Sequence, residues 1–156
     1  MSNPNSKIRI IQHNCMLSTT VMQSLLNSAI NKADILFLQE PWISKDLTTI
    51  THPTFNSIIP RTNRRPRVIT FISKSCPFEA TERTDLINDK DYQIIDIKST
   101  NFENLRVINI YNEKHQDLDQ SYTIDRLINK INLAIIDRCL LVGDFNAHHN
   151  LWNSMC

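Results

Sequence analysis

The segment Leu140-Leu-Val-Gly-Asp-Phe-Asn-Ala-His-His149 gives the clearest indication of how this chain folds and what it does. It has the pattern of a buried strand that stops at Gly143, the only glycine of the protein. Residues two apart in a strand point to the same side, so Asp144 and Asn146 are expected to face one site. Aspartate supplies charge or basicity, and asparagine supplies an uncharged donor and acceptor. This pair suits a site that binds a phosphate and a water molecule.

Length and composition set the limits within which this segment is interpreted. The chain has 156 residues, enough for one domain or most of one, and 41% of them are hydrophobic. No apolar run approaches the roughly 20 residues of a membrane span. Residues 1–6 are polar and predicted to be disordered, so no secretory signal peptide is expected. The formal net charge is +1, so a polyanion would have to be bound through a local basic patch or a metal ion.

The four cysteines are scattered and form no C-x-x-C pair, which favours free thiols. Cys15, Cys76 and Cys139 lie in or beside predicted strands and are expected to be buried. A zinc site that combines Cys15, His13 and the His148–His149 pair is an alternative without supporting spacing.

The order of the predicted elements indicates an α/β fold with mixed or antiparallel sheets. Adjacent strands are interspersed with helical crossovers, and a pure Rossmann alternation is not seen. A glycine-rich phosphate loop is also missing, which argues against nucleotide-binding enzymes of the Walker or dinucleotide type. Periodicity and β-branched residues predict strands over residues 7–14, 35–40, 55–59, 67–73, 92–98, 105–111 and 139–142, and helices over 20–32 and 117–134.

Chemically related polar residues follow several of these apolar strands. Strand ends are where sites are built on sheets, because the framework holds the side chains in place. Mg²⁺ prefers hard oxygen ligands, and Glu40 is a candidate for one. Asp144 is a candidate to orient or deprotonate a water molecule. The remaining strand-end candidates, which could donate to phosphate oxygens or order the metal shell, are Asn14, Tyr111 and Asn146.

Each of these residues alone also has an ordinary structural explanation. A Glu-Pro after a strand is commonly a solvated strand end, and Asp-x-Asn is commonly a turn or a helix cap. Tyr-Asn after a strand is commonly turn chemistry. Their joint occurrence at successive strand ends favours a site.

The same motifs resemble those of the endonuclease/exonuclease/phosphatase superfamily. The matching segments run in family order over nearly the whole chain. The chain is most similar to the apurinic-type endonuclease domain of fungal and other non-LTR (LINE-type) retrotransposons, since Pro41-Trp42 follows the Glu and His-His-x-x-Trp follows Asn146. The segments are Gln12-His-Asn14, Ile35-Leu-Phe-Leu-Gln-Glu-Pro-Trp42, Arg67-Val-Ile-Thr-Phe-Ile-Ser-Lys74, Val107-Ile-Asn-Ile-Tyr-Asn112 and Leu141-Val-Gly-Asp-Phe-Asn-Ala-His-His149.

The resemblance implies a four-layered α/β sandwich of two packed mixed β-sheets flanked by helices, formed by residues 7–156. It implies a Mg²⁺-dependent phosphodiester hydrolase, with Mn²⁺ as an alternative ion, that nicks DNA. By position, Glu40 resembles the metal ligand and Asn14 its neighbour at the metal. Tyr111 resembles the residue that contacts the phosphate, with Asn112 a less secure match beside it. Asp144 and Asn146 resemble the pair that positions water and phosphate.

Relatives continue into further strands that carry another metal-site Asp and a closing Asp-His pair, which this sequence lacks. The resemblance therefore implies a domain that is incomplete at its C-terminus, and it leaves open whether the chain is an active enzyme. Two alternatives stand beside the endonuclease: a phosphatase or phosphodiesterase of the same superfamily, and a degenerate, non-catalytic fragment. The expected partners are DNA and the reverse transcriptase part of the same element, without a membrane, in an intracellular and nuclear setting.

One basic cluster, Arg61-Thr-Asn-Arg-Arg-Pro-Arg67, offers the local positive charge that DNA binding would require. Arg64, Arg65 and Arg67 are candidates to neutralise backbone phosphates. A solvated loop between two strands is the structural alternative.

Overall fold

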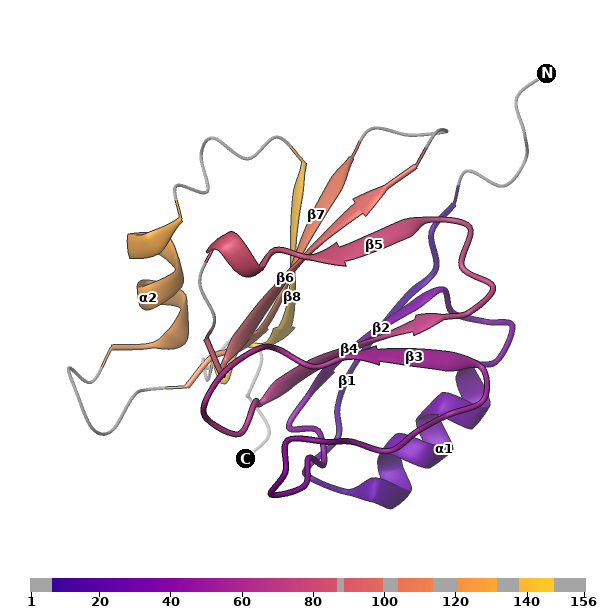
Figure 1. Ribbon diagram of the computed structural model, residues 1–156. Coiled ribbons are helices and arrows are strands. Elements are labelled where there is room, and N and C mark those ends of the chain that lie inside the picture. The colour runs from indigo at the N-terminus through magenta and orange to yellow at the C-terminus, as the bar shows by residue number, and fades with distance from the viewer. Residues whose placement is uncertain (1–6, 87–88, 100–103, 114–120, 132–137, 148–156) are drawn as a thin grey trace, which may run out of the picture.

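The computed structural model describes residues 7–86, 89–99, 104–113, 121–131 and 138–147. These residues form two four-stranded sheets that pack face to face, and one helix covers the outer face of each sheet (Figure 1). Both sheets are mixed, so the predicted four-layered sandwich is confirmed. Within the described residues, no helix is long and apolar enough to cross a membrane.

The first sheet has the strand order β1-β2-β4-β3. Strands β1 and β2 run parallel, and the other neighbours run antiparallel. Helix α1 connects the parallel pair. It begins after Ser18, whose hydroxyl accepts a 3.2 Å hydrogen bond from the amide of Val21 and so caps the first turn. The bounds are Ile10–Asn14 for β1, Thr19–Ala29 for α1, Ile35–Gln39 for β2, Phe55–Ile58 for β3 and Val68–Ser73 for β4.

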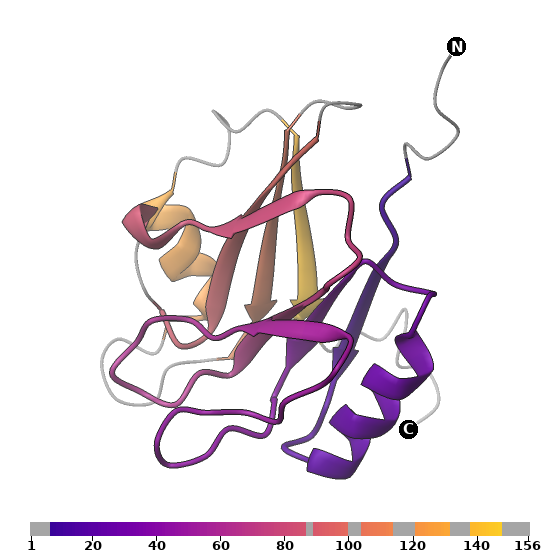
Figure 2. The same ribbon diagram turned by 45° about the vertical axis from the view of Figure 1, so that its right-hand side comes forward.

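The second sheet has the order β5-β6-β7-β8 and mirrors the first in one respect. Its parallel pair, β7 and β8, is also connected through a helix, α2. Figure 2 shows β6, β7 and β8 side by side, with α2 outside them and the first sheet across the interface. The bounds are Glu79–Glu82 for β5, Tyr92–Lys98 for β6, Leu105–Tyr111 for β7, Thr123–Lys130 for α2 and Cys139–Asp144 for β8, with a short 3₁₀ turn at Thr84–Leu86.

Each sheet thus contains one βαβ unit, β1-α1-β2 in one and β7-α2-β8 in the other. In such units, side chains that bind ligands gather at the carboxyl ends of the parallel strands. Those ends carry Asn14, Glu40, Tyr111 and Asp144, which are four of the residues predicted from the sequence.

Three apolar layers hold the sandwich together. Met22, Leu26 and Ala29 of α1 pack on the outer face of the first sheet, in the cluster that includes Leu36 and Phe71. Leu127 and Ile131 pack on the outer face of the second sheet. The middle layer, between the sheets, contains Ile35, Phe37, Ile95, Ile97 and Val107. Consecutive residues of β2 alternate between the first and middle layers, which explains why its whole run is buried.

Buried amides interrupt the middle layer. The Gln39 amide donates a 2.6 Å hydrogen bond to the side-chain oxygen of Asn109, across the interface. Asn109 donates in turn to the carbonyl oxygens of Leu38 and Ile69, at 3.2 and 3.1 Å. A second inter-sheet link joins the Thr70 hydroxyl to Gln93 at 2.7 Å. These amides satisfy one another and strand carbonyls, as buried polar groups must.

Most predicted elements occur, with differences at their ends. Helix α1 stops at Ala29 and not near residue 32, because Asn31 adopts a positive φ of 60°. The strand predicted over 7–14 starts only at Ile10, and the last strand extends to Asp144. Strand β5 was not predicted, because its Glu-Ala-Thr-Glu sequence lacks the apolar alternation of a half-buried strand. Parts of the predicted 117–134 helix, residues 1–6 and the tail with His148 and His149 lie outside the described residues.

The expectation that three cysteines are buried holds for only one of them. Cys15 is fully buried, whereas Cys76 is half-buried and Cys139 is exposed. Cys139 is exposed because it starts β8, an edge strand of the second sheet. All three are free thiols, as predicted.

Candidate active site

Two hydrogen bonds join the carboxyl ends of the two βαβ units. The Asn14 amide, at the end of β1, donates to Asp144 Oδ2 at the end of β8 over 2.8 Å. The Tyr111 hydroxyl, at the end of β7, donates to Glu40 Oε1 just after β2 over 2.9 Å. Each sheet therefore supplies one carboxylate and one hydrogen-bond donor. Side chains separated by up to 130 positions in the sequence are brought into one cluster.

Asp144 and Asn146 meet through a turn and not along a strand face. Strand β8 ends at Asp144, and Asn146 has a positive φ of 45°. The backbone amide of Asn146 donates to Asp144 Oδ1 over 3.0 Å, which closes an Asx-type turn. The Asn146 side-chain amide donates to the Asn112 carbonyl oxygen over 2.9 Å and also hydrogen-bonds Tyr111. The structure therefore brings Asp144 and Asn146 together as the sequence predicted, through a turn in place of the expected strand face.

Gly143 permits the close approach of β8 to β7 just before Asp144. It pairs with Ile110 in parallel register and has a φ of 152°. A Cβ atom at this position would lie 1.9 Å from the Ile110 carbonyl oxygen, far inside van der Waals contact. Only glycine fits here. The single glycine of the chain therefore fixes the position of Asp144 relative to Tyr111, its partner across the strand pair.

Glu40 sits on a backbone that is bonded on both sides. Its φ is 44°, a left-handed conformation that is uncommon for a residue other than glycine. Its amide donates to the Arg67 carbonyl oxygen, and its carbonyl oxygen accepts from the Leu17 amide, both over 2.8 Å. Such conformations persist when the surrounding structure enforces them, and they cluster at functional sites. Glu40 is thus held in a fixed direction, toward Tyr111.

Tyr111 is positioned to act as a proton-carrying donor. Only 8% of its surface is exposed. Burial, and then the hydrogen bond to the Glu40 carboxylate, raise the pKa of Tyr111 above that of a free phenol. The phenol therefore keeps its proton near neutral pH. The Arg67 guanidinium carbon lies 4.6 Å from the ring centroid of Tyr111, in a cation–π contact that fixes the ring.

Arg67 is held by a buried ion-pair network that the sequence did not reveal. Its Nε lies 2.7 Å from Oδ1 of the fully buried Asp91, and a second nitrogen pairs with Glu113. Arg126 of α2 binds the other Asp91 oxygen over 2.9 Å. Buried carboxylates need such partners, because an unpaired charge is expensive inside a protein. Asp91 lies before β6, at a position with no motif to mark it.

Asn112 connects three elements around the site. Its side-chain amide donates to the Phe145 carbonyl oxygen over 2.9 Å, after β8. Its side-chain oxygen accepts a 3.0 Å hydrogen bond from the Ile124 amide, in the first turn of α2. The backbone amide of Asn112 donates to the Asp144 carbonyl oxygen over 2.8 Å. Asn112 thus fixes β8 and α2 to the end of β7.

The predicted arginine cluster divides into two parts. Arg61, Arg64 and Arg65 are exposed, in the loop between β3 and β4. Arg67 is half-buried and bonded to the groups around Tyr111. Arg61, Arg64 and Arg65 are therefore free to contact a bound polyanion. Arg67 instead lies beside Tyr111, among the residues of the candidate active site.

The donor set of the cluster fits a hard divalent cation. Glu40 and Asp144 provide two carboxylates, and Asn14 adds a side-chain oxygen that also accepts a 2.8 Å hydrogen bond from the Met16 amide. Mg²⁺ is usually bound through one or two carboxylates, while waters and substrate phosphates complete its shell. Among the residues that the structure describes, no group of three or more His, Cys, Asp or Glu could hold an ion.

Comparison with known proteins agrees with this geometry. Residues 105–156 match the family described as endonuclease-reverse transcriptase. No curated protein sequence gives a significant match. The solved structure of the endonuclease domain of TRAS1, a telomere-specific non-LTR retrotransposon, is similar with a TM-score of 0.69 and 15% sequence identity. The match covers 94% of this chain and 62% of that chain, so this chain spans less than two thirds of the length of the solved domain.

The two matches complement each other, since the family covers β7 to the end and the fold covers nearly the whole chain. The chain therefore has the fold of the TRAS1 endonuclease domain, and residues 105–156 resemble the endonuclease-reverse transcriptase family, in agreement with the resemblance that the sequence motifs indicated.

Proposed function

We propose that this chain is a divalent-metal-dependent endonuclease domain of the non-LTR retrotransposon type, and that it hydrolyses a phosphodiester bond of DNA. The observation that carries the proposal is the meeting of Glu40, Tyr111, Asn14 and Asp144 through two hydrogen bonds across the sheets. Two carboxylates and neutral donors in one cluster are the groups that phosphodiester hydrolysis requires. The family match over residues 105–156 supports the same reaction class.

Asp144 is the residue that orients the attacking water. It accepts one hydrogen bond on each oxygen, from Asn14 and from the Asn146 backbone, so its carboxylate is fixed in the plane that these donors set. A carboxylate has about four acceptor sites, so free lone pairs remain for a water proton. Asn14 and Asn146 act as positioning residues for Asp144.

Tyr111 is the donor to the phosphate. Its phenol carries a proton that now points at Glu40, and rotation of the hydroxyl would turn it toward a phosphoryl oxygen. Arg67 stacks on the ring and keeps positive charge beside the developing negative charge of the phosphoryl group. Asn112 holds the strand ends on which Tyr111 and Asp144 sit.

Glu40, with Asn14 beside it, would hold the Mg²⁺ ion, or Mn²⁺ in its place. When bound, such an ion supplies charge neutralisation at the phosphoryl oxygens. Glu40 suits this role because its backbone is fixed and its carboxylate faces the cluster.

Arg64 and Arg65 would bind backbone phosphates of the DNA on either side of the cut. Both are exposed in the loop that leads to Arg67, whose carbonyl oxygen is bonded to the Glu40 amide. The endonuclease domain would nick chromosomal target DNA in the nucleus, with the reverse transcriptase of the same retrotransposon as its partner.

The test is nicking of supercoiled plasmid by the purified chain in the presence of Mg²⁺. We expect conversion to the open circle that stops with a chelator and falls at least about 100-fold in Glu40→Gln or Asp144→Asn. Glu79→Gln, at an exposed carboxylate of β5, is the matched control and should cleave normally. Absence of nicking by the parent chain, or equal nicking by all variants, would overturn the proposal.

A further inference from the structure

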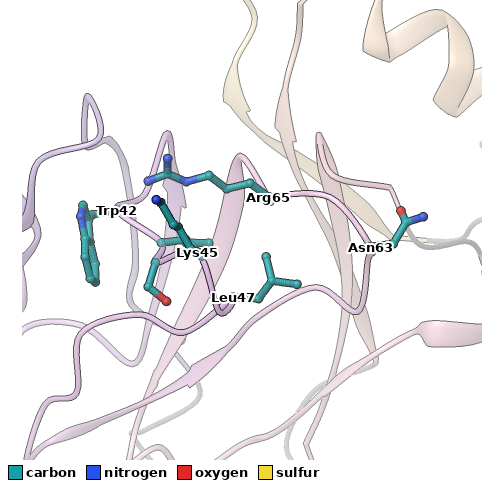
Figure 3. Close-up of a pocket in the computed structure, with 7 residues that line it drawn as sticks. Trp42, Lys45, Leu47, Asn63 and Arg65 are labelled. Atoms are coloured by element: carbon teal, nitrogen blue, oxygen red, sulfur yellow. The ribbon is translucent and has the colours of Figure 1, made fainter.

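A pocket of about 650 Å³ lies beside the cluster, between the loop after β2 and the loop before β4 (Figure 3). Its lining includes Trp42, Lys45 and Leu47 from the first loop and Asn63 and Arg65 from the second. The side chains of Arg65 and Lys45 extend toward the indole of Trp42, and Asn63 lies at the other end. Pockets of roughly 300–1,000 Å³ are the usual size for small-molecule sites.

The lining combines an aromatic face with two cations. Trp42 supplies the aromatic surface, and Lys45 and Arg65 supply the positive charge. Of the described residues that line the pocket, none is acidic, so the charges of Lys45 and Arg65 are not neutralised within it. Ser44 and Asn63 add a hydroxyl and an amide at the wall. This composition fits a ligand that is aromatic and anionic together, which is the chemistry of a nucleotide.

The aromatic wall is rigid. The Trp42 amide lies 3.0 Å from the Met22 sulfur of α1, and its carbonyl oxygen accepts a 2.9 Å hydrogen bond from the Thr49 hydroxyl. Its side chain packs on the outer apolar layer of the first sheet. The following residues are held by hydrogen bonds between Ser44 and Thr48, of 2.8 Å from the Ser44 amide and 3.1 Å to the Ser44 hydroxyl. A stacking surface that is already fixed loses little entropy on binding.

The pocket is anchored to the cluster at both walls. Trp42 is two residues from Glu40 and Arg65 two residues from Arg67, and the Glu40 amide is bonded to the Arg67 carbonyl oxygen over 2.8 Å. Two residues span at most about 7 Å. The pocket therefore opens within one or two nucleotides of a phosphate that is bound at Glu40 and Tyr111.

We propose that this pocket binds one unpaired nucleotide of the DNA strand next to the phosphate at the cluster, with its base stacked on Trp42 and its flanking phosphates on Lys45 and Arg65. A base in a duplex has both faces covered, so the nucleotide must be single-stranded or extruded to enter. The pocket would thus select DNA that is open or easily opened at the cut. This inference rests on the proposed function and adds a subsite to it.

The test is binding without cleavage, in a chelator. The full chain is titrated with a fluorescein-labelled 15-mer of thymidine and with a matched 15-mer that has one central block of abasic residues. We expect the thymidine strand to bind about tenfold more tightly, because stacking on an aromatic side chain contributes that much per base. Trp42→Ala should abolish the difference, and Trp42→Phe should keep most of it. Lys45→Ala and Arg65→Ala should weaken both strands and each lower the salt dependence by about one counterion.

The outcomes separate the subsite from the catalytic proposal. Equal binding of both strands by the parent chain would overturn the inference, and this comparison needs no variant that has to fold. An equal loss for both strands in Trp42→Ala would also overturn it, since Trp42 would then act only through the fold. If tripolyphosphate displaced the labelled strand as effectively as unlabelled thymidine strand does, the pocket would be a polyphosphate site, and the inference of a nucleotide site would be overturned. Glu79→Gln, at an exposed carboxylate of β5, should bind both strands like the parent chain. The measurement contains a chelator and no cleavage step, so a failure of nicking would not affect it.

Discussion

Asn14 and Asp144 stand 130 positions apart in the chain, and the amide of one donates to the carboxylate of the other over 2.8 Å. This hydrogen bond joins the edge strands β1 and β8 of opposite sheets. It can form only when both βαβ units are folded and packed, so it reports on the assembly of the whole site.

Asn14→Ala should lower the free energy of unfolding by about 2 kcal/mol, because a half-buried carboxylate loses a donor. Asn14→Asp should be worse, because a second carboxylate would face Asp144. Urea denaturation of the parent chain and both variants measures these losses. Asn56→Ala, at an exposed asparagine of β3, is the control, and an equal loss there would contradict the prediction.

Tyr111→Phe should remove the phenolic donor while the ring keeps its contact with Arg67. We expect plasmid nicking to fall about 100-fold, with a small change in melting temperature. A fall in nicking that merely follows a loss of folded protein in circular dichroism would argue against a role in the reaction.

Tyr92→Phe, in contrast to Tyr111→Phe, should change the stability of the chain and leave nicking unaffected. The Tyr92 hydroxyl is buried and, among the described residues, has no hydrogen-bond partner. Removing it should stabilise the chain by about 1 kcal/mol, since an unsatisfied buried group is costly. Burial raises the pKa of Tyr92 from 10.0 to about 12. The folded chain thus holds this proton more tightly, so the parent loses stability as the pH rises from about 10 through about 12. Tyr92→Phe should lose less over that range, and identical alkaline melting profiles would refute this.

Gly143→Ala should be the most damaging small substitution. Its Cβ would collide with the Ile110 carbonyl oxygen, and its φ of 152° is unfavourable for alanine. We expect a loss of about 3 kcal/mol from overpacking and backbone strain. Displacement of Asp144 should also reduce nicking by the protein that remains folded. Thermal melting and nicking at a temperature well below the transition separate these effects, and a variant that melts like the parent would show that the two strands can separate at no cost.

Local patterns in the sequence predicted most of the strands and the polar residues at their ends, whereas the two packed sheets were implied by the resemblance to a known superfamily. Buried runs such as 35–39 mark central strands, and polar residues that follow them mark the carboxyl ends. The conformations of Glu40 and Asn146 were not predictable, because a positive φ at such residues is enforced by long-range hydrogen bonds. Asp91 and Arg126 were missed for a similar reason. Their importance comes from their position beneath Arg67, which no spacing in the sequence encodes.

The amides buried between the sheets have a consequence for how the two halves of the site find their alignment. Flat apolar faces tolerate sliding, because one aliphatic contact replaces another at little cost. The hydrogen bond between Gln39 and Asn109 does not tolerate it, since a shift by one residue would strand both amides in a dry interior. Gln39 immediately precedes Glu40, and Asn109 lies two residues before Tyr111. The buried pair thus fixes the register between the sheets, so that the strand ends that carry Glu40 and Tyr111 lie opposite each other.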